Sequence, residues 1–129
     1  MAPHAQPPVD RRTIGAAAER VAASYLAGEG AEILFRNYRR RLGELDVVAR
    51  LGTVLLIVEV RTRSSETFGG AAASITGAKR RRIVRAARQL LQRHQDLARL
   101  QARFDVIVVH DPLAAQPQVE WLRGAFEAN

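Results

Sequence analysis

Residues 43–63 read GELDVVARLGTVLLIVEVRTR, and this stretch decides the fold. Two runs, GELDVVAR (43–50) and TVLLIVEV (53–60), are separated by a short turn signal. Strand-like segments joined in this way are typical of a β-hairpin. Two carboxylates, Asp46 and Glu59, nevertheless stand inside runs that otherwise have the composition of buried strands. The stretch therefore predicts a hairpin with acidic side chains within it.

The predicted hairpin brings both acids to one face of the sheet. A two-residue turn at Leu51 and Gly52 makes Asp46 and Glu59 diagonal neighbours, about 7 Å apart. A four-residue turn would instead place Asp46 directly opposite Glu59, and either register leaves them on the same face. Arg61 follows Glu59 by two residues, so it points the same way if the strand continues that far.

Two neighbouring carboxylates at the edge of an apolar face are unfavourable unless another group offsets their negative charge. Burying each charge costs several kcal/mol, and mutual repulsion favours protonation of one of them. A divalent cation would remove both problems, and oxygen ligands without His or Cys favour Mg²⁺ or Mn²⁺. Ion pairs between Asp46, Glu59 and two of the arginines are the alternative, and spacing alone leaves both explanations open. Glu19 is a third candidate for this acidic site. It falls on the apolar stripe of a predicted helix, where an acid is unexpected.

The remaining pattern predicts one α/β domain. Helical periodicity covers 13–28, with Thr13 as N-cap, and 75–101. Strand-like runs occupy 31–39, 43–50, 53–60, 104–110 and 119–122. The order is α-β-β-β-α-β-β, which indicates a central mixed β-sheet flanked by helices. We expect a flexible N-terminal tail over 1–12, a single domain over 13–126, and a loop over 61–74 whose Phe68, Gly69 and Gly70 cover the site.

Basic charge is concentrated in one segment. The net charge of the 129 residues is +7, and the segment from Lys79 to Arg103 holds nine basic residues against one acid. Such a stripe favours a polyanionic partner, although a solvated helix face is the ordinary alternative. Lys79 is the only lysine of the chain, since all the other basic residues are arginine.

Composition and terminal sequence exclude several classes of protein. The chain has no cysteine, which excludes disulfides and cysteine-based zinc sites. The segment MAPHAQPPVDRR lacks the apolar core of a secretory signal, and no apolar run approaches the roughly 18 residues of a membrane span. We expect a cytoplasmic protein with no membrane partner.

Asp105 follows Arg103 at the start of a strand, so we expect a salt bridge or a role at the strand end for it. For Trp121 we expect a role in packing.

Seven short motifs together resemble a known family. They are G-x-x-x-E (15–19), N-Y-R (37–39), G-E-L-D (43–46), V-E-V-R (58–61), F-G-G (68–70), S-I-T-G-A-K (74–79) and R-F-D-V (103–106). Their order and spacing, over about residues 13 to 126, resemble the YraN-like family of uncharacterised bacterial proteins. That family is similar to Holliday-junction resolvases of the PD-(D/E)XK nuclease superfamily, the restriction-endonuclease-like fold.

The resemblance implies a site and an activity. Asp46, Glu59 and the main-chain carbonyl of Val60 would bind Mg²⁺ or Mn²⁺, and Glu19 would complete the catalytic set. The expected function is metal-dependent hydrolysis of phosphodiesters in structured or branched DNA, with DNA favoured over RNA and a homodimer as a fitting assembly. Phosphate contacts are expected from Lys79, Arg80, Arg81, Arg82, Arg85 and Arg88.

Arg61 departs from the superfamily pattern, which has lysine at this position. Arginine stays protonated and cannot act as a base, but it can stabilise charge on a phosphate, so Arg61 remains a candidate catalytic residue. The departure also leaves open a catalytically inactive nucleic-acid-binding module on the same fold. Lys79 could supply the missing ammonium if the start of its helix faces the acids; a solvated helix end is the ordinary alternative.

Overall fold

The computed structural model describes residues 9–41, 43–63 and 75–128. Its elements follow the predicted order, with two helices and five strands. They are α1 (Arg11–Gly28), β1 (Glu32–Arg40), β2 (Gly43–Leu51), β3 (Val54–Arg63), α2 (Gly77–Arg93), the short 3-10 helix η2 (Leu97–Arg99), β4 (Gln101–His110) and β5 (Gln118–Phe126). The predicted α/β class with a mixed sheet is therefore confirmed.

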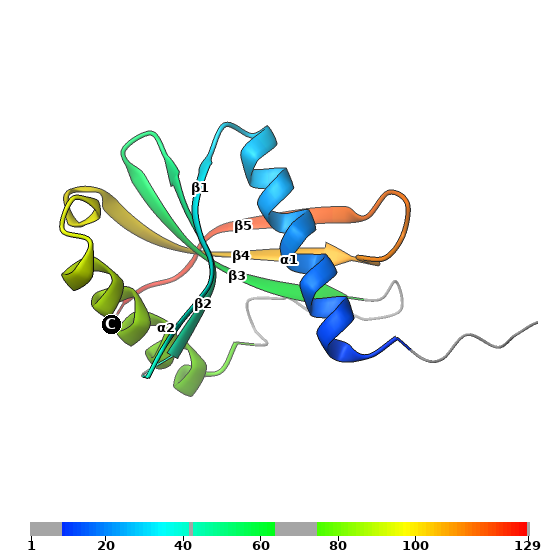
Figure 1. The fold of residues 1–129 in the computed structure, drawn as a ribbon, viewed down its shortest axis with the longest axis horizontal. Coiled ribbons are helices and arrows are strands. Elements are labelled where there is room, and N and C mark those ends of the chain that lie inside the picture. The colour runs from blue at the N-terminus through cyan, green and yellow to red at the C-terminus, as the bar shows by residue number, and fades with distance from the viewer. Residues whose placement is uncertain (1–8, 42, 64–74, 129) are drawn as a thin grey trace, which may run out of the picture.

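The five strands form one sheet in the order β1-β2-β3-β4-β5. Only β3 and β4 run parallel, and α2 lies in the crossover between them, as a parallel connection requires. Figure 1 shows α1 and α2 on either side of the sheet. Side-chain alternation along β3 gives each helix its own apolar cluster: Leu55 and Ile57 pack with α2, whereas Leu56 and Val58 pack with α1.

The β2–β3 hairpin forms, but its turn lies one residue later than predicted. Leu51 pairs with Val54, so the turn residues are Gly52 and Thr53. Gly52 adopts a φ of +61°, which glycine tolerates at little cost. The resulting register sets Val48 opposite Ile57, and it is the register in which Asp46 would come directly opposite Glu59. The two-residue turn at Leu51 and Gly52 was therefore wrong, because Leu51 still belongs to the strand.

Both helices differ from the prediction at their ends. Helix α1 begins at Arg11 because Asp10, rather than Thr13, is its N-cap: the Asp10 carboxylate accepts a hydrogen bond of 2.8 Å from the Thr13 amide. The first two residues of this helix were predicted to belong to the tail. Helix α2 begins after its N-cap Thr76 and ends at Arg93, eight residues before the predicted end at residue 101. The apolar periodicity continues past that end because Leu97 is buried in the same cluster from η2.

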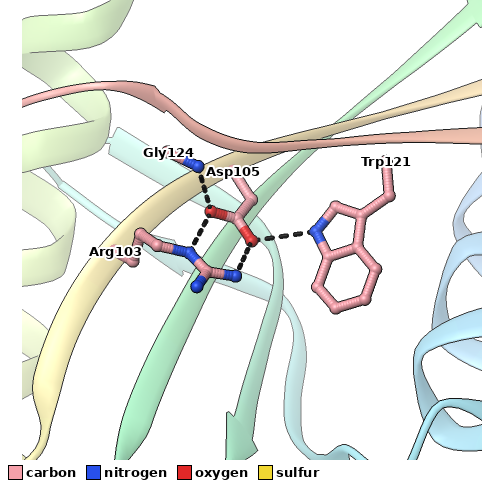
Figure 2. A network of polar contacts seen from close by, with 4 residues as sticks. All are labelled: Arg103, Asp105, Trp121 and Gly124. Carbon is pink, nitrogen blue, oxygen red and sulfur yellow. Dashed lines mark hydrogen bonds and ion pairs between the residues drawn. The ribbon is translucent and has the colours of Figure 1, made fainter.

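Strands β4 and β5 are held together by a buried carboxylate (Figure 2). Asp105 is fully buried and accepts hydrogen bonds from Arg103 Nε and Nη2, both 2.9 Å, from Trp121 Nε1, 2.8 Å, and from the Gly124 amide, 2.8 Å. The pairing of β4 with β5 shifts register at this point, and Gly124 has a φ of +60°. The expected salt bridge of Asp105 is confirmed, and its function is to satisfy the donors of a bulged strand pair.

No helix within the described ranges is long and apolar enough to cross a membrane. The predicted Phe68-Gly69-Gly70 loop lies outside the residues that the structure describes.

Candidate functional site

Strands β2 and β3 separate at Asp46. Their Cα pairing runs from the turn to Val47 and Val58 and ends there. One residue further along β2, Asp46 Oδ2 accepts a hydrogen bond of 2.9 Å from the amide of Val60 on β3. The carboxylate thus satisfies a strand amide that the diverging backbone of β2 leaves without a partner. This contact fixes Asp46 at the fork between the two strands.

A local irregularity turns the start of β2 toward α2. Asn37 lies on β1 between the pairs Arg36–Val47 and Tyr38–Leu45, and it has a φ of +52°, which is uncommon for a residue with a side chain. Leu45 packs in the cluster on the α2 side, whereas Val47 packs on the α1 side. Normal alternation would put these two on one face, so the strand rotates at the position of Asp46.

The rotated start of β2 packs directly on the backbone of α2. A Cβ added to Gly43 would lie 2.6 Å from the carbonyl oxygen of Arg82 and 3.4 Å from Cβ of Ala86. Only glycine permits this approach without movement of one backbone. The first residue of the G-E-L-D motif therefore sets how closely α2 lies against the fork.

The close approach of α2 brings the only lysine of the chain to the acids. Lys79 Nζ lies 2.8 Å from Glu59 Oε1, in an ion pair whose acid is 4% exposed and whose lysine is 39% exposed. The N-cap residue Thr76 positions the first turn, since its hydroxyl accepts a hydrogen bond from the Lys79 amide. The start of α2 therefore faces the acids, as it must if Lys79 is to supply an ammonium group to the site.

The environment of Asp46 favours its protonated form. Burial and, next, the negative charge of Glu59 raise the pKa of Asp46 from 3.8 to about 8. Hydrogen bonding with Glu59 and the charge of Glu19 raise the pKa further, and the hydrogen bond from Val60 opposes them. Asp46 therefore carries a proton at neutral pH, while Glu59 beside it forms the ion pair with Lys79.

Both acids open into a depression of about 420 Å³, which we call the fork depression. Its polar walls come from the β1–β2 connection and from α2: Arg39, Arg40, Arg41, Glu44, Lys79 and Arg82. Arg39 is 3.4 Å from Glu44, and Arg40 donates to the Tyr38 hydroxyl at 3.1 Å while its guanidinium stacks over that ring. Cations thus surround a floor of two carboxyl groups, an arrangement suited to a phosphate beside a metal ion.

Two of the predicted catalytic residues lie outside this depression. Glu19 is half-buried on α1 and acts on Asp46 only as a nearby charge. Arg61 is half-buried on β3, is not among the lining residues, and its Nε has no hydrogen-bond partner in the described part of the chain. In the described ranges, no group of three His, Cys, Asp or Glu side chains could hold a metal ion.

The predicted phosphate-binding residues fall on two sides of α2. Lys79 and Arg82 line the fork depression. A second depression of about 600 Å³, which we call the outer groove, contains the other four: Arg80, Arg81, Arg85 and Arg88.

Sequence reasoning missed the three consecutive arginines Arg39, Arg40 and Arg41 as part of the site. The signal was present, because three adjacent cations directly precede the strand that carries Asp46. The antiparallel pairing of β1 with β2 and the packing of β2 on α2 place them beside the acids, a tertiary arrangement that spacing does not reveal.

Comparison with known proteins identifies relatives over most of the chain. The profile of "Uncharacterised protein family UPF0102" matches residues 18–109. A UPF0102 protein of Alkalilimnicola ehrlichii is 46% identical over 121 residues, which is 94% of this chain and 92% of the relative. UPF0102 proteins of Nitrosomonas europaea and Frankia casuarinae are 42% and 46% identical, covering 89% and 88% of this chain and 94% and 95% of their own lengths.

Proposed function

Since the chain belongs to the uncharacterised protein family UPF0102, the YraN-like family, whose name states no activity, we propose its function from the site itself. The protein is a metal-dependent nuclease of the PD-(D/E)XK type that hydrolyses phosphodiesters in structured or branched DNA. One observation carries this proposal: Asp46, Glu59 and Lys79 meet in one depression whose walls are lined by arginines.

The donor set suits Mg²⁺ or Mn²⁺. Two neighbouring carboxyl groups that face one depression supply the oxygen ligands typical of a site for a hard divalent ion. Mg²⁺ is commonly held by one or two carboxylates together with substrate phosphates, so a pair of acids is sufficient. Asp46, Glu59 and the carbonyl of Val60 would hold it. Bound there, the ion would supply a Lewis acid and lower the pKa of water.

Lys79 supplies what Arg61 cannot. Its ammonium reaches Glu59 from α2, and so the site contains a lysine although the strand position holds arginine. Placed beside the acids, this cation positions water or stabilises the negative charge that develops on the phosphate. Glu19 tunes the pair electrostatically from α1, and Arg61 remains a weaker candidate for phosphate stabilisation.

The walls of the fork depression bind the phosphodiester backbone without reading sequence. Arg41 and Arg82 are exposed, and Arg40 is held in place by the Tyr38 ring beneath it. Arginine side chains pair with phosphate oxygens, and such contacts orient a nucleic acid rather than specify bases. We therefore expect the protein to select its DNA substrate by structure rather than by base sequence.

The test is cleavage of end-labelled flap and four-way junction DNA by the full chain, with Mg²⁺, Mn²⁺ or EDTA. We expect cleavage with either metal ion and a loss of at least about 100-fold in Asp46→Asn and Glu59→Gln, because each removes half of the metal-binding pair. The exposed acid Glu32, at the opposite end of β1 from the fork, provides the control variant Glu32→Gln, which should retain the rate.

Salt-dependent DNA binding without cleavage at any Mg²⁺ or Mn²⁺ concentration would contradict hydrolysis. That result would establish the second candidate, a catalytically inactive nucleic-acid-binding module on the same fold.

A further inference from the structure

Helix α2 carries cations on both of its exposed flanks. Lys79 and Arg82 face the fork depression, and Arg81, Arg85 and Arg88 line the outer groove. At about 100° per residue, the last three lie within about 60° of each other and their centre is about 90° from Arg82. The buried residues Ile83 and Ala87 lie on the remaining side, so one helix separates two basic surfaces.

These arginines are available to a partner. Arg81, Arg82, Arg85 and Arg88 are exposed, and none of them forms an ion pair with any residue that the structure describes. Helix α2 contains no acidic residue, and among the described residues Glu127 is the single acid that lines the outer groove. The described protein thus supplies few charges that offset the repulsion among these side chains, which favours a polyanionic ligand.

The two surfaces are poorly suited to single-stranded nucleic acid. Proteins that bind single strands stack bases on exposed aromatic rings. No aromatic residue of the described chain lines either depression. Two of the arginines that line these depressions lie over rings instead: Arg40 over Tyr38 at 4.6 Å and Arg80 over Phe126 at 5.5 Å. Bases that stay paired and stacked within a duplex need no such rings.

Building on the proposed function, we propose that α2 lies along a groove of duplex DNA, with one strand at the fork depression and the complementary strand at the outer groove. A helix is about 10–12 Å across, and the major groove is about 12 Å wide between its phosphate rows. Cations on the two flanks of one helix therefore match the two backbones. The strand at the acids is cut, and the strand at the outer groove holds the duplex in position.

The experiment measures binding in EDTA, so that cleavage plays no part. Affinities of the full chain for a 20-base-pair duplex, a length of about two helical turns, and for one of its single strands are compared over a range of salt concentrations. We expect Arg85→Gln/Arg88→Gln to weaken duplex binding by about tenfold and to lower the salt slope by about 2, one for each lost phosphate contact. The same variant should bind the single strand with less than about a twofold change.

Two further variants make the comparison specific. Arg82→Gln removes a cation on the fork side and should weaken binding of duplex and single strand alike. Arg12→Gln/Arg20→Gln removes two exposed cations from α1, on the other face of the sheet, and should change neither affinity. This control separates a local contact from a loss of net charge.

Equal losses for duplex and single strand in Arg85→Gln/Arg88→Gln would overturn the proposal, because one strand would then cross both surfaces. No change in either affinity would overturn it too, as would absence of any binding by the unmodified chain. The cleavage assay decides the proposed function separately: duplex-selective loss without cleavage would retain this inference and reject hydrolysis.

Discussion

Lys79 Nζ and Glu59 Oε1 are 2.8 Å apart, although twenty positions separate the two residues in sequence. The ion pair connects the start of α2 to β3 at the point where β2 separates from β3. It gives the site a lysine that the V-E-V-R motif lacks.

Replacement of this lysine should have a larger effect than replacement of Arg61. We expect Lys79→Met to lower DNA cleavage by about 100-fold, the usual cost of removing a preorganised group that stabilises developing charge. Arg61→Met should cost less than about tenfold, because Arg61 does not line the fork depression. Single-turnover cleavage of a flap substrate measures both. A larger loss of cleavage rate in Arg61→Met than in Lys79→Met would show that Arg61, and not Lys79, has the catalytic role.

The protonation of Asp46 should make stability depend on pH. Its pKa in the folded chain is about 8, against 3.8 as its ordinary value. Between these values the folded state binds a proton that the unfolded state lacks, so the stability of the wild type falls as pH rises, by at most about 1.4 kcal/mol per unit. Asp46→Asn mimics the protonated form and removes this dependence. Its stability relative to the wild type should therefore increase from pH 5 to pH 8.

Urea denaturation in EDTA at four pH values from about 5 to 8 measures this difference. Asp10→Asn is the matched control: the Thr13 amide lowers the pKa of Asp10, so this group titrates below the window and should leave the slope unchanged. Parallel curves for the wild type and Asp46→Asn would show that Asp46 is already ionised at pH 5.

Contact between β2 and α2 should make Gly43 intolerant of a side chain. Gly43→Ala places a Cβ 2.6 Å from a backbone oxygen of Arg82, so one backbone must move. We expect a loss of about 1–3 kcal/mol in the free energy of unfolding. Gly15→Ala adds the same atom to α1, where nothing lies within 4 Å, and should stabilise the chain by up to about 1 kcal/mol. Equal effects of both changes would contradict the close packing at the fork.

The buried Asp105 network should contribute to stability and not to the site. Asp105→Asn leaves the Arg103 guanidinium without its charged partner, which should cost about 3 kcal/mol. Trp121→Phe removes a single hydrogen bond and should cost about 1 kcal/mol. Glu120→Gln, which alters a surface contact of 3.8 Å with His110, should change stability by less than about 0.5 kcal/mol. Denaturation measures these effects, while an altered Mn²⁺ affinity would show that the network extends to the acids.

Much of the fold follows from local patterns in the sequence. Apolar runs and turn residues are sufficient for the hairpin, because β2 and β3 are buried on both faces, between α1 and α2. The exact turn does not follow, since Leu51 serves a strand as well as it serves a turn. Helix α2 was predicted too long because Leu97 continues the apolar spacing from a separate 3-10 helix.

Less of the site could be predicted, because it depends on how elements pack. Strand alternation predicts Asp46 and Glu59 on one face, but their meeting also depends on the rotation of β2 at Asp46, which alternation does not predict. The approach of Lys79 depends on the packing of Gly43 against Arg82, which no periodicity encodes. Glu19 was predicted from the apolar stripe of its helix and Arg61 from its spacing after Glu59, but neither residue lines the fork depression.

All residues that line the fork depression in the described structure lie between Arg39 and Ile83. One uninterrupted stretch of coding sequence therefore specifies the whole constellation. Of the elements outside that stretch, α1 acts on the depression through the charge of Glu19, while β4 and β5 complete the sheet that supports it.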